Sequence, residues 1–282
     1  MAMDIALTAG MRNNLLSLQN TTTLQAQTQG RLATGKKVNS ALDNPTNFFA
    51  AQSANNRAND LTSRKDGMSE AVQMVSAANA GITGITALIQ SAQGVAQAAL
   101  ATTSMTDRAS LATTYNTLMT QVTQLSSDSG YRGTNLLNAA KQTVEFAPAT
   151  NGATLQIVGF DATSTGLNIT TAGATAGAAG WGDATAATGT TQIQSAASQL
   201  EGALTALRTQ SSSLSANLAV VTTRQDFTDN MINTLQTGAD NLTLADMNKE
   251  GANMLMLQTR QSLGTTSLSM ASQAAQSVLK LF

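Results

Sequence analysis

The chain has 282 residues, with 15 basic and 16 acidic side chains, no histidine and no cysteine. The near balance of charge argues against nucleic-acid binding, which needs a basic surface, and the two missing residue types remove the commonest general base, the commonest metal ligands and the thiol nucleophile. We therefore expect no catalytic residue, no cofactor, no metal site and no nucleic-acid partner.

The sequence shows neither a secretory signal nor a membrane segment. The first twenty residues lack a basic region followed by an apolar stretch and a small-residue cleavage site. No apolar run approaches the roughly 20 residues that a membrane-spanning helix needs. We expect a soluble chain without membrane insertion, which uses another route if it is exported.

Residues 1–40 are predicted to form a helical segment with few charges. Up to residue 30 the only charged side chains are Asp4 and Arg12. One face repeats at the helical spacing of three and four residues, and it consists of Met11, Leu15, Leu18, Thr22, Gln25, Gln29 and Leu32.

A second helix is expected to begin at Pro45, because proline fits the first helical position, where its missing N–H costs nothing. Asp43 or Asn44 can cap this helix. Phe48 and Phe49 follow directly and are expected to be buried.

Three further segments repeat apolar residues at spacings of three and four, the pattern of helices that pack along a seam. The first seam consists of Ala71, Val75, Ala78, Ile82, Ile85, Ile89, Ala92, Ala96 and Ala99. The second consists of Leu111, Tyr115, Leu118, Val122 and Leu125. The third consists of Ile193, Ala197, Leu200, Leu204, Leu207, Ser211, Leu214, Leu218, Val221, Gln225, Thr228, Ile232 and Leu235. The chain is thus predicted to be mostly α, a long antiparallel coiled-coil-like bundle built from its N- and C-terminal regions.

The helical pattern stops in the middle of the chain, at residues 141–190. Three short strand-like runs, separated by turn residues, lie at 143–146, 153–158 and 166–170. The stretch 171–190 is almost wholly Ala, Gly and Thr, so we expect a small β-rich or irregular surface lobe with mobile loops. Trp181 is interpreted as the local anchor of this lobe, and a contact site for a partner is the alternative.

The last segment, residues 238–282, carries two neighbouring rows of apolar and small residues. The first row consists of Met254, Leu257, Gln261, Gly264, Leu268, Ala271, Ala275, Val278 and Phe282. The second consists of Leu263, Ser267, Met270, Ala274, Ser277 and Leu281. A solitary surface helix does not tolerate apolar residues on several faces, and two terminal helices can cover only one side of each other. We therefore expect other copies of the chain to cover the rest, through Met11, Leu15, Leu18, Met254, Leu257, Leu263, Leu268, Met270, Val278, Leu281 and Phe282.

Other patterns have structural interpretations. Residues 35–37 (Gly-Lys-Lys) lack the spacing and the preceding strand of a phosphate-binding loop, so we interpret them as a hinge with solvated lysines. Asp43 and Asp246 have no second acid or histidine nearby and are interpreted as helix-capping residues, with Thr243 and Asp246 at capping-box spacing. The methionines of the last helix, Met254, Met256 and Met270, are interpreted as core residues that fill gaps.

Four segments, in the same order, resemble bacterial flagellins. They are NNLLSLQN (13–20), RLATGKKVNSALDNP (31–45), SDSGYRGTNLL (127–137) and LADMNKEGANMLMLQTRQSLGTTSLSMASQAAQSVLKLF (244–282). The resemblance covers residues 1–140 and 190–282 and fails across the middle, where flagellins vary. The short middle and the low charge resemble most the flagellins of alphaproteobacteria.

The resemblance implies a structural subunit that polymerises with copies of itself into the extracellular flagellar filament. Residues 1–40 and 238–282 would form an inner helical layer, 41–140 and 191–237 the surrounding helical layer, and 141–190 the outward-facing lobe. The resemblance also implies secretion through the flagellar type III apparatus, an export chaperone at the C-terminal helix, and contacts with the filament cap and hook–filament junction proteins.

Two other classes share some of these features. A chemoreceptor-type coiled coil needs a membrane span or one unbroken hairpin, whereas residues 141–190 interrupt the seams here. A hook–filament junction protein is the closer alternative, although its C-terminus usually matches flagellin more loosely than this chain does. An enzyme has no candidate residues in this sequence.

Overall fold

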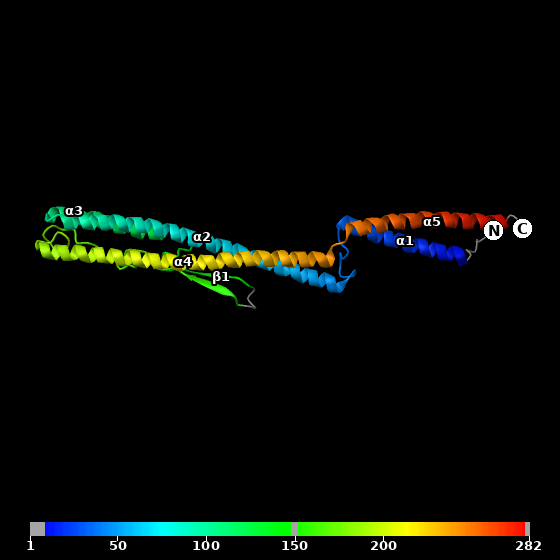
Figure 1. Cartoon of the computed structure of the whole chain (residues 1–282), viewed down its shortest axis with the longest axis horizontal. Coiled ribbons are helices and arrows are strands. Elements are labelled where there is room, and N and C mark those ends of the chain that lie inside the picture. Colours follow the sequence, from blue (N-terminus) through cyan, green and yellow to red (C-terminus); the bar gives the residue numbers. More distant parts are fainter. Residues whose placement is uncertain (1–8, 148–151, 280–282) are drawn as a thin grey trace. The chain divides into compact units, whose positions relative to one another are not determined.

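The computed structural model describes residues 9–147 and 152–279, and these residues are mostly α-helical, as predicted (Figure 1). In chain order the elements are α1 (Ala9–Thr34), α2 (Pro45–Ala101), α3 (Met105–Asp128), β1 (Lys141–Glu145), β2 (Thr154–Val158), α4 (Ala186–Thr243) and α5 (Met247–Leu279). The chain forms two compact units: a terminal unit of residues 1–58 and 233–282, and a central unit of residues 59–232.

In the central unit, α2 and α4 run antiparallel. The Ser211 hydroxyl on α4 donates to Asn79 Oδ1 on α2 at 3.2 Å, and Gln225 donates to the Ser69 hydroxyl at 2.7 Å, so numbers rise on one helix as they fall on the other. The first predicted seam lies in the core of this unit, since each of its nine residues is at most 5% exposed.

The other two seams are buried in part. On α3 the fully buried positions are Arg108, Ala109, Ala112, Tyr115, Met119, Val122 and Ser126. The predicted Leu118 is only half-buried and packs against the core, whereas the adjacent Met119 is buried. On α4 the buried leucines are Leu200, Leu204, Leu207 and Leu214, whereas Leu218 is half-buried.

A buried arginine that the sequence analysis did not single out connects the ends of three helices. Arg108 is 4% exposed. Its Nε donates to the carbonyl oxygens of Ala99 and Thr102 at 3.1 and 2.7 Å, near the end of α2. Its two terminal nitrogens donate to the carbonyl of Ala186 at 3.3 Å and the hydroxyl of Thr190 at 3.2 Å, at the start of α4. These bonds satisfy a cation that would be costly to bury unpaired.

β1 and β2 form an antiparallel hairpin, with register from Lys141 opposite Val158 to Glu145 opposite Thr154. The expected third strand at 166–170 is wrong, because this segment is a turn. The Thr163 N–H donates to Asp161 Oδ1 at 2.9 Å, and such local side-chain bonds compete with strand formation.

Trp181 is buried in the central unit, where its ring lies 4.9 Å from the ring of Tyr115 on α3. This position agrees with an anchor for the middle segment rather than with a contact site for a partner. The Ala/Gly/Thr-rich stretch that contains Trp181 is also partly helical, since α4 already begins at Ala186.

In the terminal unit, side-chain caps mark the first residues of α2 and α5. Asn44 caps α2 by accepting the Asn47 N–H at 3.0 Å, and Asp246 caps α5 by accepting the Asn248 N–H at 3.0 Å. Thr243 is not part of a capping box, because its hydroxyl donates to Ala239 within α4. The expected burial of Phe49 is also wrong, since it is 58% exposed.

Among the described helices, α2 meets the length and composition criteria for a membrane span, with an 18-residue window of mean hydropathy 1.4. The expectation that no apolar run approaches this length is therefore wrong for α2. The same average arises in a core helix, and 39% of this window is buried inside the chain. The criterion is thus weak evidence for a membrane segment.

Candidate self-assembly surface

The two terminal helices, α1 and α5, lie side by side and run antiparallel (Figure 1). Asn14 Nδ2 on α1 lies 3.4 Å from the Ser267 hydroxyl on α5, to which it donates. At the other end of the pair, Arg31 Nη1 lies 3.1 Å from Glu250 Oε1. The contact between the helices therefore extends over at least the residues between these two pairs.

The inner face of α1 carries mainly small and polar residues. Its buried residues are Met11, Thr21 and Thr28. The Thr21 hydroxyl donates to the Ser17 carbonyl at 2.8 Å, so this buried polar group is satisfied within its own helix. The predicted row differs here, because Thr21 rather than Thr22 lies inside and Leu15 is exposed.

Large apolar side chains lie on the outside of the terminal unit. Among the described residues, sixteen large hydrophobic side chains are exposed, and eleven of them belong to this unit although it is the smaller one. The eleven are Leu15, Leu16, Leu24, Leu42, Phe49, Leu244, Met247, Leu255, Met256, Leu263 and Met270. An apolar surface of this kind indicates an interaction site.

The structure separates the two predicted rows of α5. In the first row, the side chains from Met254 to Ala275 are buried or half-buried. In the second row Leu263, Met270, Ala274 and Ser277 are exposed. The other helices of the terminal unit therefore cover one row and leave the other in contact with solvent.

The residues predicted for self-association fall into three groups. Met11 and Leu257 are buried within the terminal unit, so they contribute to the packing of the subunit itself. Half-buried are Leu18, Met254 and Leu268. Exposed are Leu15, Leu263 and Met270. The side chain of Val278 and the residues Leu281 and Phe282 lie outside the part that the structure describes.

Sequence analysis missed other exposed apolar residues on these helices. Leu16 and Leu24 on α1, and Leu255 and Met256 on α5, lie outside the predicted rows. For Leu16, Leu255 and Met256 the sequence does carry a signal: each follows another apolar residue directly, and adjacent side chains of a helix point about 100° apart, so both cannot lie on one narrow face. Leu24 has no such signal, because it lies between Thr23 and Gln25. The interpretation of Met256 and Met270 as core residues is wrong, since both are exposed.

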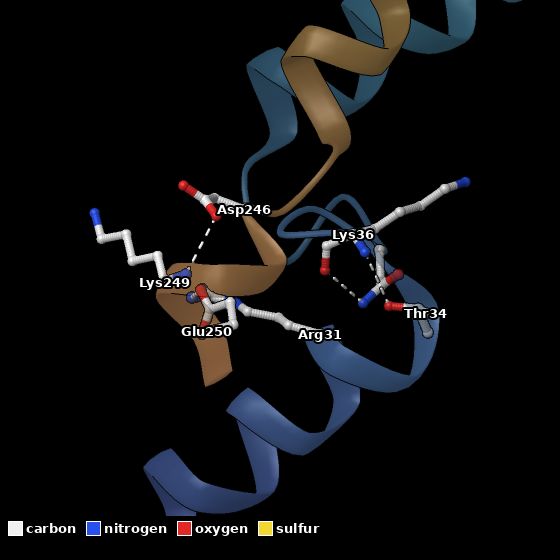
Figure 2. Close-up of polar contacts among 7 residues, drawn as sticks. Arg31, Thr34, Lys36, Asp246, Lys249 and Glu250 are labelled. Carbon is white, nitrogen blue, oxygen red and sulfur yellow. Dashed lines mark hydrogen bonds and ion pairs between the residues drawn. The ribbon is translucent and has the colours of Figure 1, made fainter. Parts of the chain in front are cut away.

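A polar junction connects the end of α1 to the start of α5 (Figure 2). Arg31 reaches across to Glu250, and Asp246 accepts the Lys249 N–H at 3.2 Å. Gly35, with a φ of 71°, ends α1 in the left-handed conformation that favours glycine. Residues 35–37 thus form a helix-terminating connection rather than a phosphate loop.

A cleft of about 600 Å³ lies at this junction. Its charged lining consists of three basic and three acidic side chains: Arg31, Lys37, Lys249, Asp43, Asp246 and Glu250. Backbone N–H groups of Asn39 and Ser40 donate to Asp43 and lower the pKa of its carboxyl. The balanced charges give no preference for a charged ligand. Among the described residues, no three acidic side chains lie close enough together to hold one metal ion.

The fold and this surface define a class of protein: a helical subunit with a well-buried central core and with apolar side chains exposed along its terminal helices. Residues 7–142 match the family model of the bacterial flagellin N-terminal helical region, and residues 197–282 match that of the C-terminal helical region. The chain belongs to the bacterial flagellin family.

Individual relatives support the same assignment. Flagellin FljN of Caulobacter vibrioides is 30% identical over 272 residues, which cover 95% of each chain. Flagellin FljK of the same organism is 29% identical over 97% of this chain and 96% of its own length. Flagellin B of Rhizobium meliloti is 31% identical over 33% of this chain and 24% of its own. The predicted likeness to flagellins of alphaproteobacteria is confirmed. The chain is thus a structural subunit of the extracellular flagellar filament, which polymerises with copies of itself.

Proposed function

We propose that α1 and α5 form the surface through which copies of this subunit contact one another in the filament. One observation carries the proposal: on these helices large apolar side chains remain exposed although threonines are buried. Thr21 and Thr28 are buried, whereas Leu16 is 59% and Leu263 is 65% exposed. A neighbouring copy that covers the leucines would remove this apolar area from water.

The energies favour assembly over an isolated helix pair. Each leucine or methionine side chain contributes roughly 1.5–3 kcal/mol when it becomes fully buried. In α5, whose side chains are described as far as Ser277, only Glu250 and Leu257 are fully buried, so packing within the subunit stabilises this helix little. Helices with little tertiary packing are marginal in water.

The proposed layers follow from the same surface. Residues 1–40 and 238–282 would form the inner layer, 41–140 and 191–237 the surrounding layer, and 141–190 the outward-facing lobe. The breaks between helices at 35–44 and 244–246 support limits close to these. The compact units divide elsewhere, inside α2 and α4.

The same exposed face of α5 suits the further partners of a flagellin subunit. An export chaperone that covers Leu255 and Leu263 would prevent premature association before secretion. The filament cap and the hook–filament junction proteins would contact the same terminal helices at the two ends of the filament. We also propose that the role is structural and not enzymatic, as it is for the flagellin relatives.

The test compares two substitutions of exposed residues. Leu263→Gln removes an apolar contact on α5, and Val158→Gln makes a similar change on β2, outside the proposed surface. Both monomers should melt like wild type. Elongation from sheared filament seeds should slow at least about tenfold for Leu263→Gln, because each 1.4 kcal/mol changes an association constant tenfold. Equal elongation rates for the two variants would place the assembly surface elsewhere.

A further inference from the structure

One exposed face of α5 presents a leucine with one methionine before it and one after it along the helix. Met256, Leu263 and Met270 follow one another at intervals of seven residues, so they lie along one side of the helix. They are 50%, 65% and 60% exposed. Each of the first two stripe residues directly precedes a residue of the row that packs within the terminal unit, namely Leu257 and Gly264. The stripe therefore points about 100° away from that row around the helix axis.

The composition makes these sulfur atoms chemically prominent. The chain has twelve methionines and no cysteine, so the thioether is its only reduced sulfur group. The described methionines differ in accessibility: Met68, Met74 and Met119 are buried in the central unit, whereas Met105, Met247, Met256 and Met270 are exposed. Met11 is buried in the terminal unit, and Met231 and Met254 are half-buried. Oxidation follows exposure, and it changes an apolar side chain into a polar one.

We propose that Met256 and Met270 form an oxidation site through which peroxides control the addition of subunits to the filament. In this reaction the thioether sulfur attacks one oxygen of hydrogen peroxide, an S–O bond forms, and the O–O bond breaks. The sulfur loses two electrons, and the second peroxide oxygen leaves as water after it takes up the proton of the transferred oxygen. The proposal rests on the self-assembly role of α5 proposed above.

The consequence follows from burial. A sulfoxide oxygen is a strong hydrogen-bond acceptor, and it is costly to bury without a donor. Two of the three side chains in the stripe would carry this group, so an oxidised subunit should add poorly. A subunit already in the filament has the stripe covered by its neighbour, so its two sulfur atoms are protected from peroxide.

The experiment treats full-length monomer with hydrogen peroxide and measures each methionine by peptide mass spectrometry. Met256 and Met270 should become sulfoxides together with Met105 and Met247, while Met68 and Met119 stay reduced. Elongation of seeds by the treated monomer should fall at least about tenfold, and methionine sulfoxide reductase should restore it. Preformed filaments should oxidise at Met256 and Met270 more slowly than monomer, whereas Met105 serves as the internal reference.

Variants assign the effect to the two residues. The double variant Met256→Leu/Met270→Leu should elongate normally and keep its rate after peroxide. The matched variant Met105→Leu removes an exposed methionine of the central unit and should remain as sensitive as wild type. The proposal is overturned if fully oxidised wild type elongates at the untreated rate, or if the double variant loses its rate as wild type does. Failure of the assembly surface itself would appear without peroxide, as normal elongation by Leu263→Gln.

Discussion

Leu18 of α1 packs directly on Gly264 of α5: a Cβ atom at position 264 would lie 2.8 Å from Leu18 Cδ2 and 3.1 Å from Leu18 Cγ. The two helices can approach this closely only because α5 has no side chain at that point. The contact lies between the Asn14–Ser267 and Arg31–Glu250 pairs, and it therefore sits inside the antiparallel α1–α5 pairing.

Replacing this glycine tests how much the subunit depends on the α1–α5 contact. Gly264→Leu should push the two helices apart, so that amide hydrogen exchange in α1 and α5 becomes faster and seeded elongation slows. Gly251→Leu is the matched control, because a Cβ at position 251 meets no atom within 4 Å. Both changes replace a helical glycine by leucine, and this replacement by itself stabilises the helix by up to about 1 kcal/mol. Equal protection in the two variants would mean that the α1–α5 contact contributes little.

A carboxylate in the buried row of α4 should unfold the central unit. Leu204 is buried in its core, and truncating such a leucine to alanine costs about 2–5 kcal/mol. Leu204→Asp adds an unpaired buried charge and should cost more than that, so thermal unfolding shifts to lower temperature and filaments do not form. Val220→Asp lies on the same helix at an exposed position and should melt close to wild type. An unchanged melting curve for Leu204→Asp would contradict this packing.

Tyr115 should make the central unit sensitive to alkaline pH. Burial raises the pKa of its hydroxyl from 10.0 to about 12. Between these values the unfolded chain loses this proton while the folded chain keeps it. The free energy of unfolding therefore falls as the pH rises from about 10 to about 12, by up to about 2–3 kcal/mol from this group.

Tyr115→Phe isolates the contribution of that hydroxyl. The Tyr115 oxygen has no hydrogen-bond partner in the described part of the chain, so at pH 7 the variant should be at least as stable as wild type. Urea unfolding at pH 8 and pH 11 should show that the variant loses less stability than wild type between these two pH values. The titration of lysines affects both proteins equally and cancels in this comparison. Identical pH dependence would show that Tyr115 keeps an ordinary pKa.

Removing the last helix tests the division of roles between the two units. Truncation after Leu242 deletes α5 and leaves the central unit, whose core is complete by itself. The truncated protein should remain folded, soluble and monomeric, and it should fail to add to seeds. Aggregation of the truncated protein would mean that α5 covers part of the central core, and normal filament growth would mean that other contacts hold the polymer.

Limited proteolysis independently measures how well α1 and α5 are packed in the monomer and in the filament. Cleavage of monomer should trim both ends and stop near residues 40 and 240, because the connections 35–44 and 244–246 lack regular helix. Filaments should resist, because neighbouring copies cover the terminal helices in the proposed assembly. Equal cleavage of monomer and filament would contradict a covered position for α1 and α5.

The sequence by itself determined the elements with strong periodicity. The first seam, from Ala71 to Ala99, is buried at each predicted position. The regular spacing of three and four residues places all nine side chains on one face of the helix. The flagellin family was also readable from the two ends, since their motifs are local. In the middle, local side-chain bonds at Asp161 and Thr163 made a turn from a segment that apolar pattern alone assigned to a strand.

The tertiary structure decided which faces of the terminal helices are covered. Leu15 and Leu16 are adjacent and chemically identical, so the sequence could not tell how α1 is rotated against α5. The rotation depends on a few contacts between residues distant in sequence, namely Leu18 with Gly264 and Arg31 with Glu250. Thr21 can face inward because its hydroxyl donates to the Ser17 carbonyl of its own helix. These contacts bury Thr21 and Leu257 and leave Leu15, Leu16 and Leu263 exposed, and only the folded chain reveals this division.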